Sequence, residues 1–369
     1  MIAKLRHTVR QATALMVLLL AFASCSSKGD LPEDPGTVYK FGFYVNVGDN
    51  AGASRATPTD GEYNPGSGWE NHIDIAGGDI RVVLFNTDNT FLTEITDFQI
   101  TPLASYESSK LYYINAGTKV DISDGKFKIV IVANWGTDNY PTVWNFDNIF
   151  SITYSFQPGK PLGADNLIPL YGVKSIAISG GIRPNIAADL GTIHLLRAMA
   201  KVEVLYSDDL YTIKSLHLRN YNGRGYCAPV NVTEEEQYVK HNWNNDYTSL
   251  PSIPVPPMRH EETLAFNYVG KDGSGRDSYV LYVPEYSNLT SPASDPTPPS
   301  IIEISFNEGF GDTRTITFRN GDAPCDILRN VWYRFIVTKK SEESDIQVEV
   351  DVLPYRVIEL NPDFGLDIE

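Results

Sequence analysis

The chain has few of the residues that build catalytic and metal sites. Its 369 residues include three cysteines and six histidines. His72, His194, His217, His241 and His260 form no H-x-x-x-H pair and have no cysteine at ligand spacing. No G-x-S-x-G elbow, P-loop or H-E-x-x-H motif is present. The sequence therefore predicts a protein that is not an enzyme and that holds no metal and no cofactor.

Basic residues are also scarce. Lys and Arg total 30 against 46 Asp and Glu, which gives a formal net charge of −16. Phosphate backbones and anionic membrane surfaces repel a chain this acidic. We therefore expect no nucleic-acid partner.

No apolar run has the roughly 20 residues that span a bilayer comfortably. The run at residues 14–23 is short and follows three basic residues, which is typical of a secretory signal over residues 1–24. Cys25 comes directly after Phe22-Ala23-Ser24, as in a bacterial lipobox, although Phe22 stands where Leu is usual. We expect cleavage before Cys25 and lipid, including palmitate, on its thiol. An ordinary signal with a coincidental cysteine is the alternative.

The segment after the signal is polar and rich in Pro and Gly. Residues 25–37 cannot bury a core and read as a flexible, lipid-attached tether. Lipid and tether together predict a mature protein held at a membrane.

Two cysteines remain once Cys25 is assigned to the lipid. Cys227 and Cys325 fit no metal motif. Two thiols in an exported protein can form one disulfide. Two separate buried thiols are the alternative.

Aromatic and β-branched residues dominate and recur with period two, which predicts an all-β fold. The chain has 21 Tyr and 16 Phe, and Gly, Pro, Asn and Asp clusters separate its short strands, as in β-sandwiches. One short helix fits residues 142–152. We expect an N-terminal sandwich over residues 38–190 and a C-terminal one over 191–369. The expected strands cover residues 38–47, 80–85, 111–115, 127–133, 191–196, 200–206, 212–219, 278–283, 301–306, 313–318, 332–338 and 346–352.

Core positions follow from the same alternation. In the first core we expect Phe41, Val82, Phe85, Ile129, Ile131 and Trp135. In the second we expect Val202, Val204, Val280, Tyr282, Phe335 and Val337. The tryptophans read as core residues, with an exposed sugar-binding platform as the alternative.

Two loops carry charge or glycine without a clear chemical role. The Gly-rich stretch at residues 270–276 joins two expected strands and reads as a hairpin loop, since a phosphate cradle needs a helix after it. The acidic run at residues 234–236 reads as a solvated loop, with a calcium site as the alternative.

The first expected strand has a clean apolar face and a cleavable loop after it. Its alternating apolar residues are Tyr39, Phe41, Phe43, Val45 and Val47. The small, polar loop at residues 48–58 contains one basic residue, Arg55, where a trypsin-like protease would cut before Ala56. A cut there would free the first strand together with its lipid.

Near the end of the chain a second strand alternates in the same way. Its apolar residues are Ile346, Val348, Val350 and Val352. A strand removed from a sandwich leaves an apolar groove that a strand from another copy can fill, and such head-to-tail contacts build a filament. These nine residues of the two strands are the candidates for strand exchange. The alternative is that both strands belong to their own sheets.

Several segments together resemble the fimbrillins, or type V pilins, of Bacteroidales. These segments are Asp79 to Phe85 (DIRVVLF), Val130 to Trp135 (VIVANW), Leu195 to Val202 (LLRAMAKV), Tyr282 to Tyr286 (YVPEY) and Ile327 to Tyr333 (ILRNVWY). The resemblance implies two transthyretin-like β-sandwich domains and export as a lipoprotein that is surface-exposed at the cell outer membrane. It also implies cutting by an arginine-specific protease and polymerisation with other copies or related fimbrial subunits. Arg55 matches the family's cleaved arginine in position.

The function that this resemblance implies is a structural subunit of an adhesive cell-surface fimbrium. A surface glycan-binding lipoprotein of a nutrient-uptake system is the alternative. It would expose coplanar aromatic residues and would need no protease.

Overall fold

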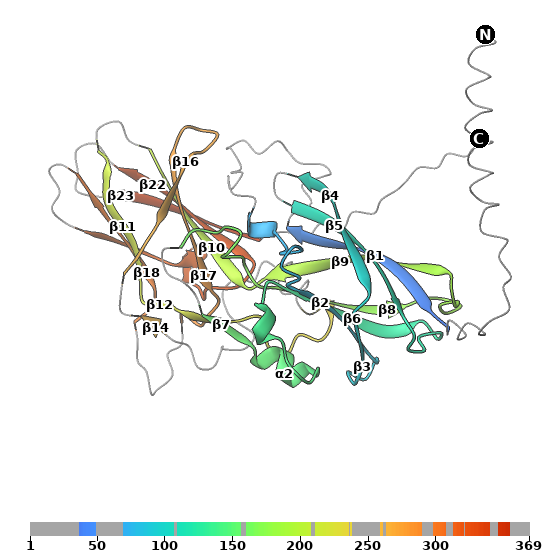
Figure 1. Cartoon of the computed structure of the whole chain (residues 1–369). Helices are drawn as coiled ribbons and strands as arrows, with labels where there is room; N and C mark the ends of the chain where they lie inside the picture. Colours follow the sequence, from blue (N-terminus) through green and yellow to red (C-terminus); the bar gives the residue numbers. More distant parts are fainter. Residues whose placement is uncertain are drawn as a thin grey trace, which may run out of the picture. The chain divides into compact units, whose positions relative to one another are not determined.

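Strands make up more than half of the described residues, and two sets of sheets contain nearly all of these strands (Figure 1). The computed structural model describes residues 37–48, 69–106, 109–155, 160–207, 211–235, 237, 259–260, 263–289, 298–307, 313–320, 322–339 and 346–354. The predicted all-β fold is confirmed.

The first sheet has the strand order β3-β2-β6-β8-β9-β1-β5-β4. Its strands are β1 (Tyr39–Gly48), β2 (Ile80–Phe85), β3 (Phe91–Ile95), β4 (Phe98–Tyr106), β5 (Ser109–Thr118), β6 (Lys126–Ala133), β8 (Leu170–Ala177) and β9 (Ala187–Arg197). β8 and β9 pair only at Leu170↔Arg197 and Tyr171↔Leu196. The halves on either side of this short pairing enclose one apolar cluster, so the sheet forms a sandwich with itself.

We call this cluster the inner core. It contains residues from both halves of the sheet, among them Phe41, Val45, Val82, Leu84, Ile114, Ile129, Ile131 and Ile193. These side chains alternate along their strands because successive residues of a strand point to opposite faces.

Two further sheets form the second sandwich. One has the order β16-β17-β10-β22-β23 and the other β15-β11-β18-β19. The strands are β10 (Met199–Tyr206), β11 (Ile213–Arg219), β15 (Leu264–Ala265), β16 (Asn267–Lys271), β17 (Asp277–Pro284), β18 (Ile301–Phe306), β19 (Arg314–Thr317), β22 (Val331–Lys339) and β23 (Ile346–Pro354). The second core lies between them and includes Val202, Val204, Leu281, Ile304, Phe335 and Val337.

The remaining elements are short. Three strand pairs join β12 (Tyr221–Asn222) to β14 (Arg259–His260), β13 (Arg224–Tyr226) to β7 (Thr153–Ser155), and β20 (Arg319–Asn320) to β21 (Ala323–Pro324). The helical pieces are η1 (Trp69–Asn71), η2 (Thr137–Asn139) and α2 (Phe146–Ser151). Helix α2 confirms the expected short helix, and the Asn145 side chain caps it by accepting from the Asn148 N–H.

A third cluster, the side cluster, covers the outer face of β2, β6 and β8. It joins Val83, Phe85 and Trp135 to α2 residues and to Cys227. The expectation that Phe85 and Trp135 belong to the first core was therefore wrong. Strand β2 is buried on both faces, so Val82 and Leu84 enter the inner core while Val83 and Phe85 face the other way.

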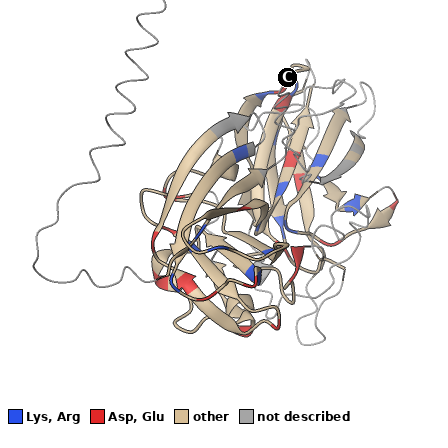
Figure 2. Ribbon diagram, turned by 90° about the vertical axis from the view of Figure 1, so that its right-hand side faces the viewer, with Lys and Arg blue, Asp and Glu red and all other residues tan. Residues whose placement is uncertain are grey.

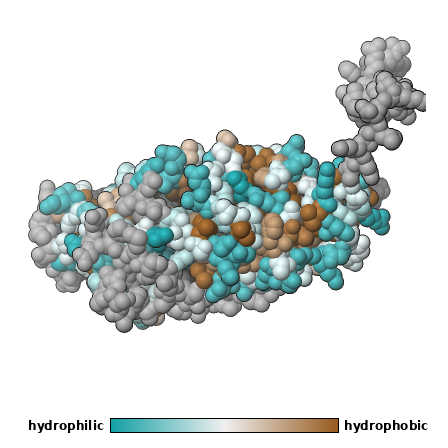
Figure 3. Space-filling view, turned by 60° about the horizontal axis from the view of Figure 1, so that its bottom comes forward, coloured by the Kyte–Doolittle hydropathy of each residue, from teal (hydrophilic) through white to brown (hydrophobic). Residues whose placement is uncertain are grey.

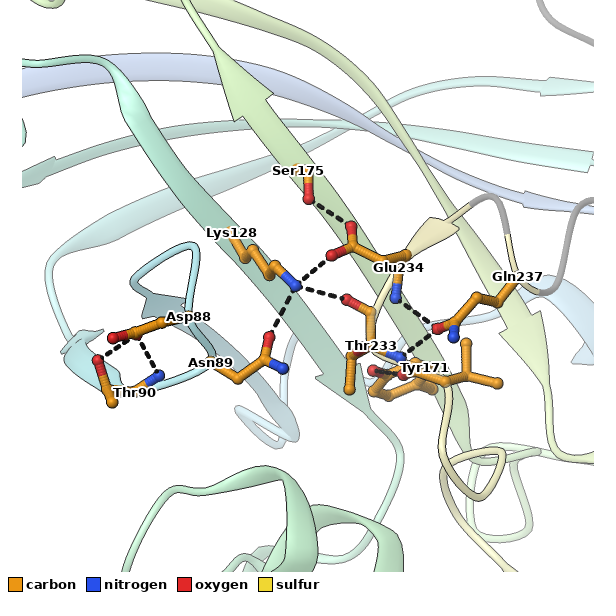
Figure 4. A network of polar contacts seen from close by, with 10 residues as sticks. Asp88, Asn89, Thr90, Lys128, Tyr171, Ser175, Thr233, Glu234 and Gln237 are labelled. Atoms are coloured by element: carbon orange, nitrogen blue, oxygen red, sulfur yellow. Dashed lines mark hydrogen bonds and ion pairs between the residues drawn. The ribbon is translucent and has the colours of Figure 1, made fainter.

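A strap of chain from the second half crosses this outer face (Figure 4). Lys128 on β6 donates to Asn89 and to the Thr233 carbonyl, and it pairs with Glu234, which also accepts from Ser175. Burial favours a raised pKa for Glu234, but these hydrogen bonds outweigh it and lower the pKa. Glu234 is thus an ion-pair partner of the first sheet, whereas Glu236 of the same acidic run lies outside the described residues.

A buried polar cluster, the junction cluster, links the two sandwiches. Glu70 of η1 accepts from Lys201 Nζ at 3.0 Å and from the Tyr282 hydroxyl. Arg197 donates to Asn71 and, at 2.9 Å, to Asn330 Oδ1. Val280 and Tyr282 were both expected in the second core, which was wrong. On β17 it is Leu281 and Val283 that enter this core, and Val280 and Tyr282 face the other side.

The chain crosses from the first sandwich to the second at Ala198, between β9 and β10. The expected boundary at residues 190 and 191 falls inside β9, which pairs with β1 and β8. β10 begins at Met199 in the second sandwich, and residues 38–369 form one unit by their contacts.

The surface is mixed. Figure 2 shows that most residues of the described strands are uncharged, with acidic and basic residues near one another on a few strands. Figure 3 shows small apolar patches between hydrophilic residues on the face in view. Among the described residues, no helix has the length and apolar character needed to cross a membrane.

Candidate strand-exchange site

β1 lies inside the first sheet, with a neighbour on each side. It pairs antiparallel with β5 over its whole length, from Tyr39↔Thr118 to Gly48↔Ser109. It pairs parallel with β9 from Lys40↔Ala187 to Val47↔Leu195. A bulge in β9 includes Gly191, whose positive φ of 71° suits glycine. Without β1, β5 and β9 would border an open groove with two unpaired backbone edges.

The inward face of β1 fills the inner core. Tyr39, Phe41, Phe43, Val45 and Val47 are all buried there, and the rings of Phe41 and Phe43 stack at 6.2 Å. Burying a large apolar side chain contributes about 1.5–3 kcal/mol. Five such residues contribute about 8–15 kcal/mol, which is as large as the stability of a typical domain. An empty groove would therefore have to be refilled.

The outward face of β1 carries Lys40, Gly42, Tyr44 and Asn46. Lys40 is exposed, whereas Gly42 and Asn46 are buried. Tyr44 packs on Tyr113 of β5 with ring centroids 5.2 Å apart.

A polar pair lies at the end of this face. Asn46 Nδ2 lies 3.4 Å from Nδ1 of His194, its register partner on β9. Burial, and then the charge of Lys174, lower the pKa of His194 to about 4. The ring is thus neutral at physiological pH.

β23 is placed differently. It is an edge strand that pairs antiparallel with β22 from Val331↔Pro354 to Lys339↔Ile346. Val348 and Val350 pack partly buried against the second core. The side chains of Ile346 and Val352 lie outside the described residues. In this structure both candidate strands lie in sheets of their own chain, and their exchange stays a prediction.

Cys227 and Cys325 lie in different apolar clusters and are not bonded to each other. Cys227 belongs to the side cluster and Cys325 to the second core, and both are free thiols. The disulfide considered from the sequence is therefore not formed, because the two residues lie in different cores. Cys25, Arg55 and Ala56 lie outside the described residues, so lipidation and cleavage stay predictions.

Two of the described tryptophans belong to a core, whereas Trp69 and Trp332 are partly exposed. Trp135 and Trp144 are buried in the side cluster, and Trp135 stacks on Tyr140 at 6.1 Å. Trp332 lies against Lys201 and the Arg334 guanidinium. Among residues with described side chains, no group of His, Cys, Asp and Glu has metal-binding geometry.

The sequence patterns missed the walls of the groove and its outward face. β9 was expected to open the second domain, and Gly42, Tyr113, Asn46 and His194 had no role. The glycine and the asparagine between apolar neighbours in FGFYVNV were the available signal.

Comparison with solved structures shows that the fold of this chain is similar to that of known proteins. No protein-family model and no curated protein matches the chain. The structure is similar to the tip fimbrial protein Mfa3 from Porphyromonas gingivalis with C-terminal truncation. Identity is 13%, the TM-score is 0.51, and the match covers 85% of this chain and 99% of that one.

A second similar structure is a fimbrial assembly protein from Parabacteroides distasonis. It is 14% identical with a TM-score of 0.45, and the match covers 86% of this chain and 99% of that one. The chain has the all-β fold of the Mfa3 structure, which confirms the fold that the fimbrillin resemblance implied.

Proposed function

We propose that this protein is a structural subunit of a cell-surface fimbrium that joins other subunits by strand exchange. The observation that carries the proposal is the position of β1. It fills the inner core with five side chains and lies between β5 and β9. In sequence it precedes a loop with one basic residue, Arg55. The fold shared with a tip fimbrial protein supports the same role.

Cleavage after Arg55 changes the competition for the groove. In the uncut chain β1 is tethered, so its effective concentration exceeds that of any strand in solution. After the cut, β1 is held only by non-covalent contacts, and a strand from another subunit can replace it. Donor and groove lie on different surfaces, so repeated exchange builds a head-to-tail filament.

The proposal includes the route to the surface. Cys25 carries lipid that anchors the chain to the outer membrane, and an arginine-specific protease releases the mature subunit. The acyl chains supply the membrane affinity. The Cys25→Ser chain should therefore be lost from the outer-membrane fraction, and its retention there would contradict the lipid assignment.

Protease treatment of purified protein tests assembly. Wild type and Arg55→Ala are incubated with an arginine-specific protease and run on gels without boiling. Wild type should form SDS-resistant ladders whose subunits begin at Ala56, while Arg55→Ala stays monomeric. Equal ladders from both proteins would refute Arg55 as the activating site.

A further inference from the structure

β1 contains a buried, incompletely hydrogen-bonded side chain, Asn46. The side chain is 1% exposed, and its Oδ1 has no hydrogen-bond partner. The distance from its Nδ2 to His194 Nδ1 is 3.4 Å, which is long for a hydrogen bond. Val45 and Val47 on either side are fully buried in the inner core. A buried polar atom without a partner destabilises the state that contains it by about 5- to 150-fold in the equilibrium constant.

The position of Gly42 imposes a second condition on the same face. A Cβ at this position would overlap the Tyr113 hydroxyl and lie 2.8 Å from Tyr113 Cζ. Tyr113 is held over Gly42 by its packing on Tyr44. Any larger residue would have to displace this ring and break the aromatic pair.

We infer that the groove between β5 and β9 fits best a strand with glycine at the position of Gly42 and an apolar residue at the position of Asn46. Such a strand avoids the unsatisfied amide, so β1 is the weaker of the two occupants. The inference rests on the proposed function, since it gives exchange its direction. Without such a difference, a released β1 would return to the groove as readily as a new strand enters it.

The chain's own β23 does not meet both conditions. If its alternating valines face inward, Leu353 can take the place of Asn46, but Glu349 then falls at the position of Gly42. Shifted by two residues, Asp351 falls beside His194 and Gln347 takes the glycine position. A strand of other sequence from a related subunit, apolar at alternate positions, therefore fits the groove better than β23 of a second copy, which enters only once cleavage has released β1.

Variants of the uncut chain test the inference independently of cleavage. Asn46→Val and Asn46→Ala remove the unsatisfied amide, and Lys40→Val is the control on the exposed part of the same face. Asn46→Val should raise the folding equilibrium constant about fivefold or more in urea unfolding. Asn46→Ala should leave it near wild type, and Gly42→Ala should lower it. A loss of stability in both Asn46 variants overturns the inference.

Peptide competition tests the groove itself. Protein cut at Arg55 is mixed with synthetic peptides of residues 38–48, and release of the lipid-free β1 fragment from a Cys25→Ser chain is followed by mass spectrometry. The Asn46→Val peptide should displace β1 at about a tenfold lower concentration than the wild-type peptide. The same peptide with Gly42→Ala should lose this advantage, and Lys40→Val should match wild type.

The two ideas fail in different ways. Equal competition by wild-type and Asn46→Val peptides overturns the inference but leaves strand exchange intact. If the protease leaves Arg55 uncut, the proposed function fails, and the uncut variants still decide the role of Asn46.

Discussion

Replacing Glu70 by Gln should destabilise the protein strongly, because Glu70 is the acidic member of the junction cluster. Its carboxylate is buried, and its Oε1 lies 3.0 Å from Nζ of Lys201, whose side chain is buried as well. The Tyr282 hydroxyl donates to the same oxygen. Glutamine keeps the shape and can still accept from Tyr282, but it removes the carboxylate charge that pairs directly with the Lys201 ammonium.

The magnitude follows from burial. Removing one partner of a buried ion pair costs about 3–5 kcal/mol, because the other charge stays desolvated. At about 2–4 °C per kcal/mol, the value for domains of roughly 150–250 residues, the melting temperature should fall by about 6–20 °C. An exposed pair is worth about 0–1 kcal/mol. Arg219–Glu303, whose arginine side chain is 46% exposed, is such a pair, so Glu303→Gln is the matched control.

The assay is thermal and urea unfolding followed by tryptophan fluorescence, with the double variant Glu70→Gln/Lys201→Met. Replacing both charges by neutral groups should recover much of the lost stability. The reasoning is refuted if Glu70→Gln is no worse than Glu303→Gln. It is also refuted if the double variant is as unstable as the sum of the two single variants.

Three further outcomes are expected. Burial favours a raised pKa for Glu70, but the charges of Lys201 and Arg197 and the Tyr282 hydrogen bond outweigh it, so the folded-state pKa lies below the usual 4.5. The ionised Glu70 carboxylate therefore stabilises the folded state fully above about pH 4.5, and this stabilisation is lost as the pH falls through the folded-state pKa of Glu70. In an acid titration, the free energy of unfolding should depend less on pH in Glu70→Gln than in wild type. Burial raises the pKa of Cys325 to about 12 and that of Cys227 further, so a thiol reagent at pH 8 should label neither in native Cys25→Ser protein, and rapid labelling would contradict their burial. Phe43→Ala should cost about 3–5 kcal/mol in urea unfolding, whereas Phe91→Ala, at a ring that is 46% exposed, should cost far less; similar losses would show that β1 does not fill the core.

The sequence predicted those strands in which apolar residues alternate along the whole strand. β1, β2, β6, β10, β18 and β22 were expected within about two residues of their ends, because apolar alternation is a property of consecutive residues. β4 and β8 were not expected. β4 contains Pro102 and a register shift, and β8 contains Gly172, so each breaks the pattern that marks a strand.

The sequence by itself determined the all-β fold and the apolar face of β1, since both follow from neighbouring residues. Only the tertiary structure decided that β9 closes the first sandwich, that Phe85 and Trp135 leave the inner core, and that Cys227 and Cys325 stay apart. It also paired Glu70 with Lys201 and Asn46 with His194, which lie 131 and 148 residues apart in the chain. Such pairs depend on which strands become neighbours, and strand order is set by the packing of whole sheets rather than by any local pattern.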